Sequence, residues 1–285
     1  LKEIKKIFIK HKPDYVFHLA AQPLVNTSYI DPIKTFETNI LGTLNILESL
    51  RYIKNRCIAV IITSDKVYKN LEIKKGYKET DILGGFDPYS ASKASAELIL
   101  KSYINSYFFK EKKNIRIGIA RAGNVIGGGD WSENRLIPDC IKSWSKNKTV
   151  ILRNPRSTRP WQHVLEALQG YLLLSLKLQN NKNLHGQAFN FGPDNKFSYD
   201  VHSVVKLMGT FWKNIRWKTI KKRKVNFHES ELLQLNSNKA KKLLNWKSIL
   251  TFRESIQLVA NWYKDFYDKK NPSLITFSQI NFFMQ

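Results

Sequence analysis

A tyrosine and a lysine four residues apart, Tyr89 and Lys93, are the pair in this sequence best suited to acid–base chemistry. At that spacing both side chains lie on one face of a helix. A free phenol has a pKa of about 10, and a neighbouring cation favours its ionised form. The spacing therefore predicts a tyrosine base whose pKa is lowered by Lys93. In a lysine-rich chain the spacing alone leaves a surface pair as the alternative.

Three further reactive side chains, Ser64, Asp65 and Lys66, follow an apolar run. Ser64 offers a hydroxyl that can bind the same substrate oxygen as Tyr89. Asp65 adds a carboxyl group that simple oxidation of an alcohol does not need, and a carboxyl group kept protonated is a general acid. The combination predicts chemistry beyond oxidation. Two plainer interpretations stay open, because an aspartate often caps a turn after a strand and Lys66 can be solvated.

The elements that must position these residues follow from the apolar pattern. Three short runs rich in isoleucine and valine show little polar alternation, as expected for strands buried on both faces of a parallel sheet: residues 15–19, 58–63 and 115–120. Helices are predicted between them, and Asp31-Pro32 and Asp87-Pro88 are typical helix starts. Strands alternating with helices predict a doubly wound α/β fold.

The pattern changes after residue 120. Glycines at 123, 127, 128 and 129 form a loop that does not lead into a periodic helix, so we interpret it as a substrate-side loop, not a dinucleotide-binding turn. Helices are predicted over residues 136–144 and 161–178, and a strand over 188–191. Residues 196–285 alternate short helices with aromatic and basic stretches, and we expect partial disorder from residue 271 onward.

The formal net charge of +24 at pH 7 is high for 285 residues. Such a field attracts anions, including nucleotide diphosphates, nucleic acids and anionic lipids. The basic residues are spread along the chain, however, and the aromatic and basic motifs of RNA-binding modules are missing. We therefore expect a solvated basic surface and no nucleic-acid partner. A basic binding module without catalytic activity remains the alternative.

Two cysteines, Cys57 and Cys140, lie far apart, without a C-x-x-C pair or a histidine–cysteine cluster. This pattern indicates reduced thiols and no bound metal. No apolar stretch approaches the roughly 18 residues that a membrane span needs. The first residues also lack the apolar centre of a signal peptide. We expect a cytoplasmic protein without membrane contact.

Seven blocks of the sequence, in order, resemble the nucleotide-sugar 4,6-dehydratases, which belong to the extended short-chain dehydrogenase/reductases. The blocks are FHLAAQPLV (17–25), TNILGT (38–43), TSDKVY (63–68), PYSASK (88–93), RAGNVIGGGDW (121–131), RPWQHV (159–164) and NFGP (190–193). The likeness runs from about residue 14 to residue 193, with a weaker match behind it.

The resemblance implies a Rossmann-type doubly wound parallel sheet that binds NAD. Related chains open with a strand, a Gly-x-x-Gly-x-x-Gly turn and a helix that hold the cofactor pyrophosphate. No such turn is present here, and residues 1–10 look like a later helix. We therefore expect that the first βα units, on the order of 60 residues, are missing. This fragment would then keep the nicotinamide end of the site and have an exposed sheet edge, and activity of the fragment itself is uncertain.

The resemblance also divides the chain. Residues 1–125 are assigned to the incomplete NAD-binding Rossmann domain, and residues 160–195 are expected to return to it. Residues 126–159 and 196–285 are assigned to a smaller substrate-binding α/β portion. The helices over 32–52 and 89–109 resemble those that form a two-fold four-helix interface, so a homodimer is expected.

The implied reaction consists of oxidation at C4 of a sugar, elimination of water across C5 and C6, and return of hydride to C6. Tyr89 is then the base for the C4 hydroxyl, Ser64 binds the C4 oxygen, and Lys93 also holds the nicotinamide ribose. Asp65 protonates the departing C6 hydroxyl, which requires a raised pKa. Lys66 is the candidate C5 base. Related dTDP-glucose enzymes have glutamate at that position, so lysine favours CDP-glucose as the substrate, in deoxysugar and polysaccharide biosynthesis.

Binding residues are assigned by the same resemblance. Ala20, Ala21 and Asn39 are expected to line the cofactor site, and Asn124, Arg135 and Arg159 are expected to contact the nucleotide-sugar diphosphate; Arg159 can alternatively be a basic surface residue. A different enzyme of the same fold, an epimerase or a reductase, is the main alternative. Asp65 and Lys66 separate the two, because those relatives eliminate no water.

Overall fold

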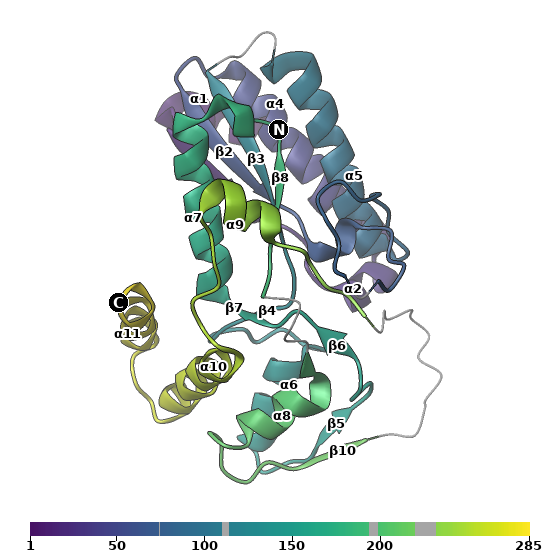
Figure 1. The fold of residues 1–285 in the computed structure, drawn as a ribbon, viewed down its shortest axis with the longest axis vertical. Coiled ribbons are helices and arrows are strands. Elements are labelled where there is room, and N and C mark those ends of the chain that lie inside the picture. Colours follow the sequence, from purple (N-terminus) through teal and green to yellow (C-terminus); the bar gives the residue numbers. More distant parts are fainter. Residues whose placement is uncertain (74, 110–113, 194–198, 220–231) are drawn as a thin grey trace.

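The computed structural model describes residues 1–73, 75–109, 114–193, 199–219 and 232–285. A parallel sheet flanked by helices forms the upper lobe in Figure 1, and a smaller lobe of helices and short strands lies below it. The sheet has four strands in the order β1-β2-β3-β8. Their bounds are Tyr15–His18, Cys57–Ile62, Ile115–Ala122 and Ala188–Phe191. The predicted strands are therefore confirmed to within two residues at each end.

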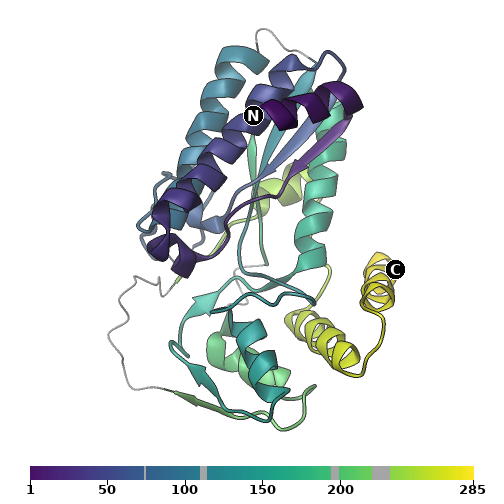
Figure 2. The same ribbon diagram turned by 180° about the vertical axis from the view of Figure 1, so that it is seen from behind.

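Every pairing in this sheet is parallel, with Ile58 beside Tyr15 and Ile119 beside Ala188. Helices cover both faces, as the apolar character of the strands predicts. On one face lie α1 (Lys2–His11), α4 (Gly42–Tyr52) and α5 (Pro88–Tyr103), whose side chains share one core cluster with β2 and β3. Figure 2 shows α1 and α4 in front of the sheet. The doubly wound Rossmann-type fold is confirmed.

The opposite face is covered by α7 (Val164–Asn180) and α9 (Asn238–Leu244). Leu174, Leu244 and Trp246 pack there against Val60 and Phe189 of the sheet. Part of the sequence after residue 196 therefore completes the core of the upper lobe. The domain boundaries assigned from the sequence stay a prediction, and α9 is the element to which they apply least well.

The lower lobe has its own core, built around Trp144, Val205 and Tyr263. Its main elements are α6 (Leu136–Trp144), α8 (Val201–Met208), α10 (Phe252–Tyr267), β5 (Val150–Leu152) and β10 (Trp217–Thr219). The predicted helix over 136–144 is confirmed. The predicted helix over 161–178 begins later, because residues 162–163 first form a strand and His163 then caps α7.

Short elements connect these layers. They are α2 (Val25–Ile30), α3 (Pro32–Phe36), π-helical segments at Glu37–Leu41 and Ile104–Phe108, 3₁₀ turns at Asp65–Val67 and Lys182–Leu184, and the paired strands β4 (Val125–Ile126) with β7 (Gln162–His163) and β6 (Thr158–Arg159) with β9 (Tyr199–Asp200). Asp31 and Asp87 cap α3 and α5 with their side chains, and a proline follows each, as predicted.

The expectation of partial disorder from residue 271 is wrong. Residues Pro272–Met284 form α11, which Asn271 caps and which packs on α10. Trp262 Nε1 donates a hydrogen bond to Thr276 Oγ1 at 3.0 Å, and Ile275 is buried. The segment is ordered because α10 offers it an apolar surface, which no local pattern in the tail reveals.

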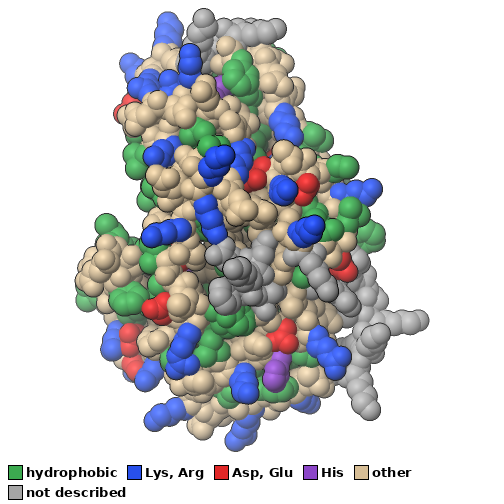
Figure 3. Space-filling view, in the orientation of Figure 1, with side chains coloured by type: hydrophobic (Ala, Val, Ile, Leu, Met, Phe, Trp, Pro, Cys, Tyr) green, Lys and Arg blue, Asp and Glu red, His purple; other side chains and the backbone are tan. Residues whose placement is uncertain are grey.

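The surface agrees with the expected spread of charge. Figure 3 shows the lysine and arginine side chains of one face scattered over both lobes. Among the described residues, no helix is both long and apolar enough to cross a membrane. Within the same residues, no cluster of three or more histidine, cysteine or acidic side chains is arranged to hold a metal ion.

Candidate active site

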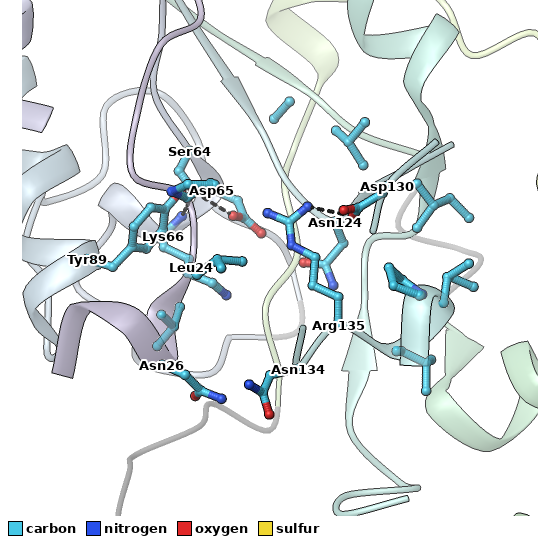
Figure 4. A pocket seen from close by; sticks show the side chains of 18 of the residues that line it. Leu24, Asn26, Ser64, Asp65, Lys66, Tyr89, Asn124, Asp130, Asn134 and Arg135 are labelled. Carbon is cyan, nitrogen blue, oxygen red and sulfur yellow. Dashed lines mark hydrogen bonds and ion pairs between the residues drawn. The ribbon is translucent and has the colours of Figure 1, made fainter. Parts of the chain in front are cut away.

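A cavity of about 650 Å³ lies where the two lobes meet, beyond the carboxyl ends of β2 and β3. Ligands of open α/β sheets bind at this edge. The upper lobe contributes Ser64, Asp65, Lys66 and Tyr89, and the loop leading into α6 contributes Arg135 from the other side. Figure 4 shows these side chains facing the same space. All five residues were selected from the sequence.

The segment that carries Ser64 and Asp65 is fixed to the sheet. Thr63 N donates to the carbonyl of Ala120 at 2.8 Å, directly after β2 ends. Ser64 then caps the following 3₁₀ turn, since its Oγ accepts from the amide of Lys66 at 3.2 Å. The Ser64 hydroxyl donates to Asp65 Oδ1 at 3.0 Å. Ser64, not Asp65, is therefore the capping residue, which leaves the Asp65 carboxyl group for another role.

Tyr89 and Lys93 lie on the buried face of α5. Asp87 Oδ1 accepts from the amide of Ser90 at 2.9 Å and fixes the first turn of that helix. Tyr89 is 7% exposed and Lys93 is 6% exposed. The alternative of a solvated surface pair is therefore wrong. A burial this complete for a lysine requires a functional or structural reason.

The electrostatics of the pair differ from the expectation. Burial raises the pKa of Tyr89 to about 12, and a hydrogen bond with Ser64 and the charge of Arg135 offset only part of this effect. The Lys93 Nζ donates to the carbonyl of Ile62 at 3.4 Å. The expected net lowering of the Tyr89 pKa is therefore not found in this structure, and the effect of Lys93 itself stays a prediction. Loss of the phenol proton therefore requires a cation or hydrogen-bond donor brought into the cavity.

Burial raises the pKa of Tyr89 but lowers that of Lys93, because it disfavours the charged form of each group. It lowers the pKa of the ammonium group from 10.5 to about 8, although the nearby Glu97 raises it. A charged, desolvated lysine destabilises the folded chain, because its proton is held more firmly in the unfolded state.

This shift predicts a pH-dependent gain in stability for Lys93→Met. Between pH about 8 and 10.5 the unfolded chain binds the Lys93 proton and the folded chain does not, so wild-type stability rises with pH through that window. The variant should be more stable by on the order of 3 kcal/mol below pH 8, at about 1.36 kcal/mol per pKa unit, with no gain above about pH 10.5. Denaturant unfolding of both proteins across this range measures the difference.

Lys101→Met, at an exposed site on the same helix, is the matched control and should show no such pH dependence. A Lys93→Met variant that is less stable than the wild type at pH 7 would contradict the assignment of a desolvated ammonium group.

The Asp65 carboxyl group is 2% exposed, and it lines the cavity. Its Oδ2 has no hydrogen-bond partner among the described residues. A buried polar atom without a partner costs stability, and it commonly marks a place where a ligand completes the hydrogen bonding. A substrate hydroxyl fits this position.

Lys66 is half-buried and separates two cavities. It lines both the cavity of about 650 Å³ and a second one of about 410 Å³, and Val25 also lines both. Figure 4 shows its side chain next to Tyr89. Lys66 is thus placed where it can reach a ligand bound between Asp65 and Tyr89, and its role as the C5 base stays a prediction.

Two of the three expected diphosphate contacts reach the cavity. Asn124, in a left-handed conformation with φ of 44°, and Arg135 both line it. Arg135 donates to Asp130 Oδ2 at 3.0 Å, so its guanidinium group is held at the rim. Arg159 does not line this cavity; it is 6% exposed and donates to the carbonyl of Thr158 at 2.8 Å. The alternative of Arg159 as an exposed basic residue is therefore wrong as well.

The expected cofactor residues lie beside β1. Ala20 and Ala21 follow its carboxyl end, and Asn39 lies in the π-helical segment behind them. Asn39 Oδ1 accepts from the amide of Gln22 at 2.8 Å, and its Nδ2 donates to Ser92 Oγ at 2.8 Å. Asn39 thus ties the segment after β1 to the helix that carries Tyr89 and Lys93. None of these three residues lines the cavity of about 650 Å³.

His18 places the end of β1 close to Lys93. Burial and the charge of Lys93 together lower the pKa of His18 to about 4, so the imidazole is neutral. Its Nε2 lies 3.2 Å from Thr43 Oγ1. His18 is a core residue with a hydrogen-bond partner. The end of β1, which leads into Ala20 and Ala21, therefore lies within electrostatic reach of Lys93.

Several lining residues were not selected from the sequence, among them Tyr171. Tyr171 lies on α7, 6% exposed, and its hydroxyl is close enough to Tyr89 and Asp65 for both to raise its pKa, after the larger effect of burial. It therefore stays a neutral hydrogen-bond donor. Tyr171 belongs to no motif block, and the only available signal was a polar-tipped side chain on the buried face of an apolar helix.

Known proteins are similar to this chain over most of its length. A family model described as GDP-mannose 4,6 dehydratase matches residues 1–259. The chain is 40% identical over 267 residues to CDP-glucose 4,6-dehydratase of Salmonella typhimurium, covering 92% of this chain and 74% of the relative. It is 26% identical to UDP-glucose 4-epimerase of Mycoplasma pneumoniae, covering 90% of this chain and 78% of that protein.

Solved structures show the same fold. The structure of UDP-glucuronic acid 4-epimerase from Bacillus cereus, in complex with UDP-glucuronic acid and NAD, superposes with a TM-score of 0.79 and 21% identity, covering 93% of this chain and 79% of that one. UDP-glucose 4-epimerase from Thermotoga maritima, with UDP-glucose, gives a TM-score of 0.77 and 23% identity over 93% of this chain and 82% of that one.

Proposed function

The chain belongs to the GDP-mannose 4,6-dehydratase family of NAD-dependent nucleotide-sugar enzymes, and from that premise we propose that it converts CDP-glucose to CDP-4-keto-6-deoxyglucose. The observation that carries this proposal is the common cavity of Tyr89 and Asp65, a phenol and a carboxyl group that line one space of about 650 Å³. An epimerase needs the phenol and not the acid. The choice of CDP-glucose is supported by the relative with 40% identity.

The residues present fit the nicotinamide end of NAD. Lys93 and the segment of Ala20 and Ala21, which Asn39 holds in place, would bind it, and the unusually desolvated Lys93 ammonium is a donor suited to a ribose. When bound, NAD supplies the hydride acceptor for C4 and later the hydride donor for C6. The remaining steps are the work of the chain's own side chains.

Oxidation at C4 depends on Tyr89 and Ser64. The Tyr89 phenolate takes the proton of the C4 hydroxyl, and the Ser64 hydroxyl donates to the C4 oxygen as the carbonyl forms. Because burial raises the pKa of Tyr89 to about 12, the phenolate forms only when the loaded site stabilises it. This requirement couples deprotonation to a filled cavity and suppresses it in an empty one.

Elimination of water depends on Asp65 and Lys66. The carbonyl at C4 acidifies the hydrogen at C5, and Lys66 is assigned as the base that accepts that proton. Asp65 donates its proton to the C6 hydroxyl, which departs as water while the C5–C6 double bond forms. The Asp65 Oδ2 atom, buried and without a partner in the described residues, is the atom assigned to this transfer.

The diphosphate of the substrate is assigned to Arg135 and Asn124 at the rim of the cavity. A guanidinium group binds a diphosphate through two parallel hydrogen bonds, and Arg135 can exchange its partner Asp130 for the ligand. The contact of Arg159 with the diphosphate rests on the family resemblance alone.

A homodimer is part of the proposal. The outer faces of α3, α4 and α5 expose apolar side chains, among them Ile33 at 71% and Leu98 at 59%. Large exposed aliphatic residues on neighbouring helices support a protein interface. We assign this face to the two-fold four-helix contact and the enzyme to cytoplasmic deoxysugar and polysaccharide biosynthesis.

The test is a direct choice among nucleotide sugars. The purified chain is incubated with NAD and, in separate reactions, with CDP-glucose, dTDP-glucose, GDP-mannose or UDP-glucose, and the products are identified by mass and by NMR. We expect loss of one water and a 4-keto-6-deoxy sugar from CDP-glucose, at a rate at least about tenfold above the others. Preference for another nucleotide would overturn the substrate, and inversion at C4 without loss of water would overturn the dehydratase assignment.

A further inference from the structure

We propose that Gly123 is the positioning residue for the acid: the missing side chain at residue 123 leaves the space that the Asp65 carboxyl group occupies. This inference rests on the proposed function of Asp65 and deepens it. Gly123 directly follows β3, which ends at Ala122. From the sequence, Gly123 could be recognised only as the first glycine of a loop.

Gly123 and the Asp65 carboxyl group lie too close together for any residue with a Cβ atom to replace the glycine. A Cβ atom on Gly123 would lie 2.1 Å from Asp65 Oδ2, 2.3 Å from its Cγ and 2.8 Å from its Cβ. Real Cβ atoms essentially never approach other heavy atoms closer than 3.0 Å. An alanine here and the present position of the carboxyl group therefore exclude one another.

Backbone conformation does not explain the glycine. Gly129 and Gly186 have positive φ angles, which favour glycine, whereas the φ angle of Gly123 lies outside that left-handed range. The contact with Asp65 is the reason that remains for the absence of a side chain.

The backbone on the Gly123 side is held in place, so the carboxyl group must give way. The carbonyl of Gly123 accepts from Gln162 Nε2 at 3.3 Å, and that of Asn124 accepts from the amide of Gln162 at 3.4 Å. Ala122, one residue earlier, is paired with Phe191 in the sheet. An added Cβ atom would require residue 123 to move by about 1 Å. Such a shift would break the hydrogen bonds with Gln162 and disturb the pairing of Ala122 with Phe191.

The carboxyl group itself is held more weakly. Its Oδ1 accepts one hydrogen bond, from Ser64 Oγ at 3.0 Å, and its Oδ2 has no partner among the described residues. Because no hydrogen bond holds Oδ2, its position depends mainly on the space that Gly123 leaves by having no Cβ atom. In Gly123→Ala the side chain of Asp65 must rotate, which moves the acid away from the position it holds in the cavity.

The chemical consequence is specific to one step. Asp65 acts in the loss of water, whereas oxidation at C4 uses Tyr89 and Ser64. Displacing an otherwise intact catalytic group by about 1 Å costs roughly 10²-fold in rate. Gly123→Ala should therefore slow elimination by about 10²-fold and leave C4 oxidation within a few-fold of the wild type, so that the C4-oxidised, still hydroxylated sugar accumulates.

The experiment measures how the reaction divides between these steps. CDP-glucose carrying deuterium at C4 is mixed with excess enzyme and NAD. Departure of deuterium from C4 is followed by NMR, because the label returns at C6 and stays in the product, and the loss of water is followed by mass. Gly192→Ala is the matched control, because a Cβ at that glycine, which follows β8, meets its nearest neighbour at 3.4 Å, an ordinary contact. This control should change neither step.

Gly128→Ala provides a second comparison, since its Cβ would lie 2.0 Å from Trp262 in the lower core. It should lower the melting temperature without changing the ratio of the two steps. Equal slowing of both steps in Gly123→Ala, or no slowing of either, would overturn the positioning role.

A crystal structure of the Gly123→Ala chain tests the same inference without any turnover. We expect the Asp65 carboxyl group to leave its present position while β3 and residue 162 stay in place. A carboxyl group that stays where it is, beside a shifted backbone, would overturn the inference. If the wild type removes water from no nucleotide sugar, the proposed function fails, and this structural result still decides whether Gly123 positions Asp65.

Discussion

Replacement of Asp65 by asparagine should stop the loss of water and leave oxidation at C4 nearly unchanged. Asparagine keeps the size of the side chain and can still accept from Ser64 Oγ, so the local structure should persist. Its amide is far too weak an acid to protonate the departing hydroxyl, and loss of a general acid costs about 10²–10⁴-fold in rate. Separate measurement of the two steps with the C4-deuterated sugar should therefore show elimination reduced by that factor.

Asp81→Asn is the control, because Asp81 lies outside both cavities and its carboxylate accepts from the amide of Lys78. It should leave both steps unchanged. An Asp65→Asn enzyme that forms the 4-keto-6-deoxy product at the wild-type rate would show that another group is the acid, and Tyr171 would then be the first candidate, because it lines the same cavity.

The second large effect concerns the ion pair beneath the site. Glu97 and Arg121 are fully buried and form a salt bridge with each other. Glu97 Oε1 also accepts from Thr63 Oγ1 at 2.7 Å and from Arg121 Nε at 2.8 Å. Arg121 NH1 donates to the Tyr68 hydroxyl at 2.7 Å. The pair thus connects the helix of Tyr89 to the strand end that carries Ser64.

Glu97→Leu should destabilise the chain by about 3–5 kcal/mol, because it leaves the Arg121 guanidinium buried without a compensating charge. Denaturant unfolding at pH 7 measures the loss. The double variant Glu97→Leu with Arg121→Met should recover most of it, since well-packed apolar residues often replace a buried ion pair without net cost.

The exposed pair of Lys6 and Glu3 is the control. Its side chains are 75% and 81% exposed, and Glu3→Gln should change the stability by less than about 1 kcal/mol. A Glu97→Leu variant as stable as the wild type, or a double variant less stable than the single one, would contradict the account of an uncompensated buried charge.

The sheet and the starts of the key helices could be predicted from local sequence, for a clear physical reason. Buried parallel strands must be apolar on both faces, and the aspartate–proline pairs at 31–32 and 87–88 supply both the cap and the first turn of a helix. Because the carboxyl ends of neighbouring parallel strands lie at one edge, the approximate place of Ser64 and Asp65 followed from the same pattern.

The pKa values of buried groups and the packing between distant segments could not be predicted from local sequence. The pKa of Tyr89 depends on how completely the folded chain removes water from the phenol, and spacing to Lys93 carries no such information. The order of α11 depends on the face that α10 offers it, and the position of Arg159 depends on its pairing with β9. Gly123 could be recognised as a positioning residue only after Asp65 was seen against it.

In the proposed mechanism the Tyr89 phenol and the Asp65 carboxyl group act on one hexose. A crystal structure of the protein with bound CDP-glucose shows whether they do. We expect the C4 hydroxyl to lie about 3 Å from the Tyr89 oxygen and the C6 hydroxyl to lie about 3 Å from Asp65 Oδ2 in the same complex. A hexose that contacts Tyr89 while its C6 hydroxyl points away from Asp65, or one bound outside this cavity, would contradict this mechanism.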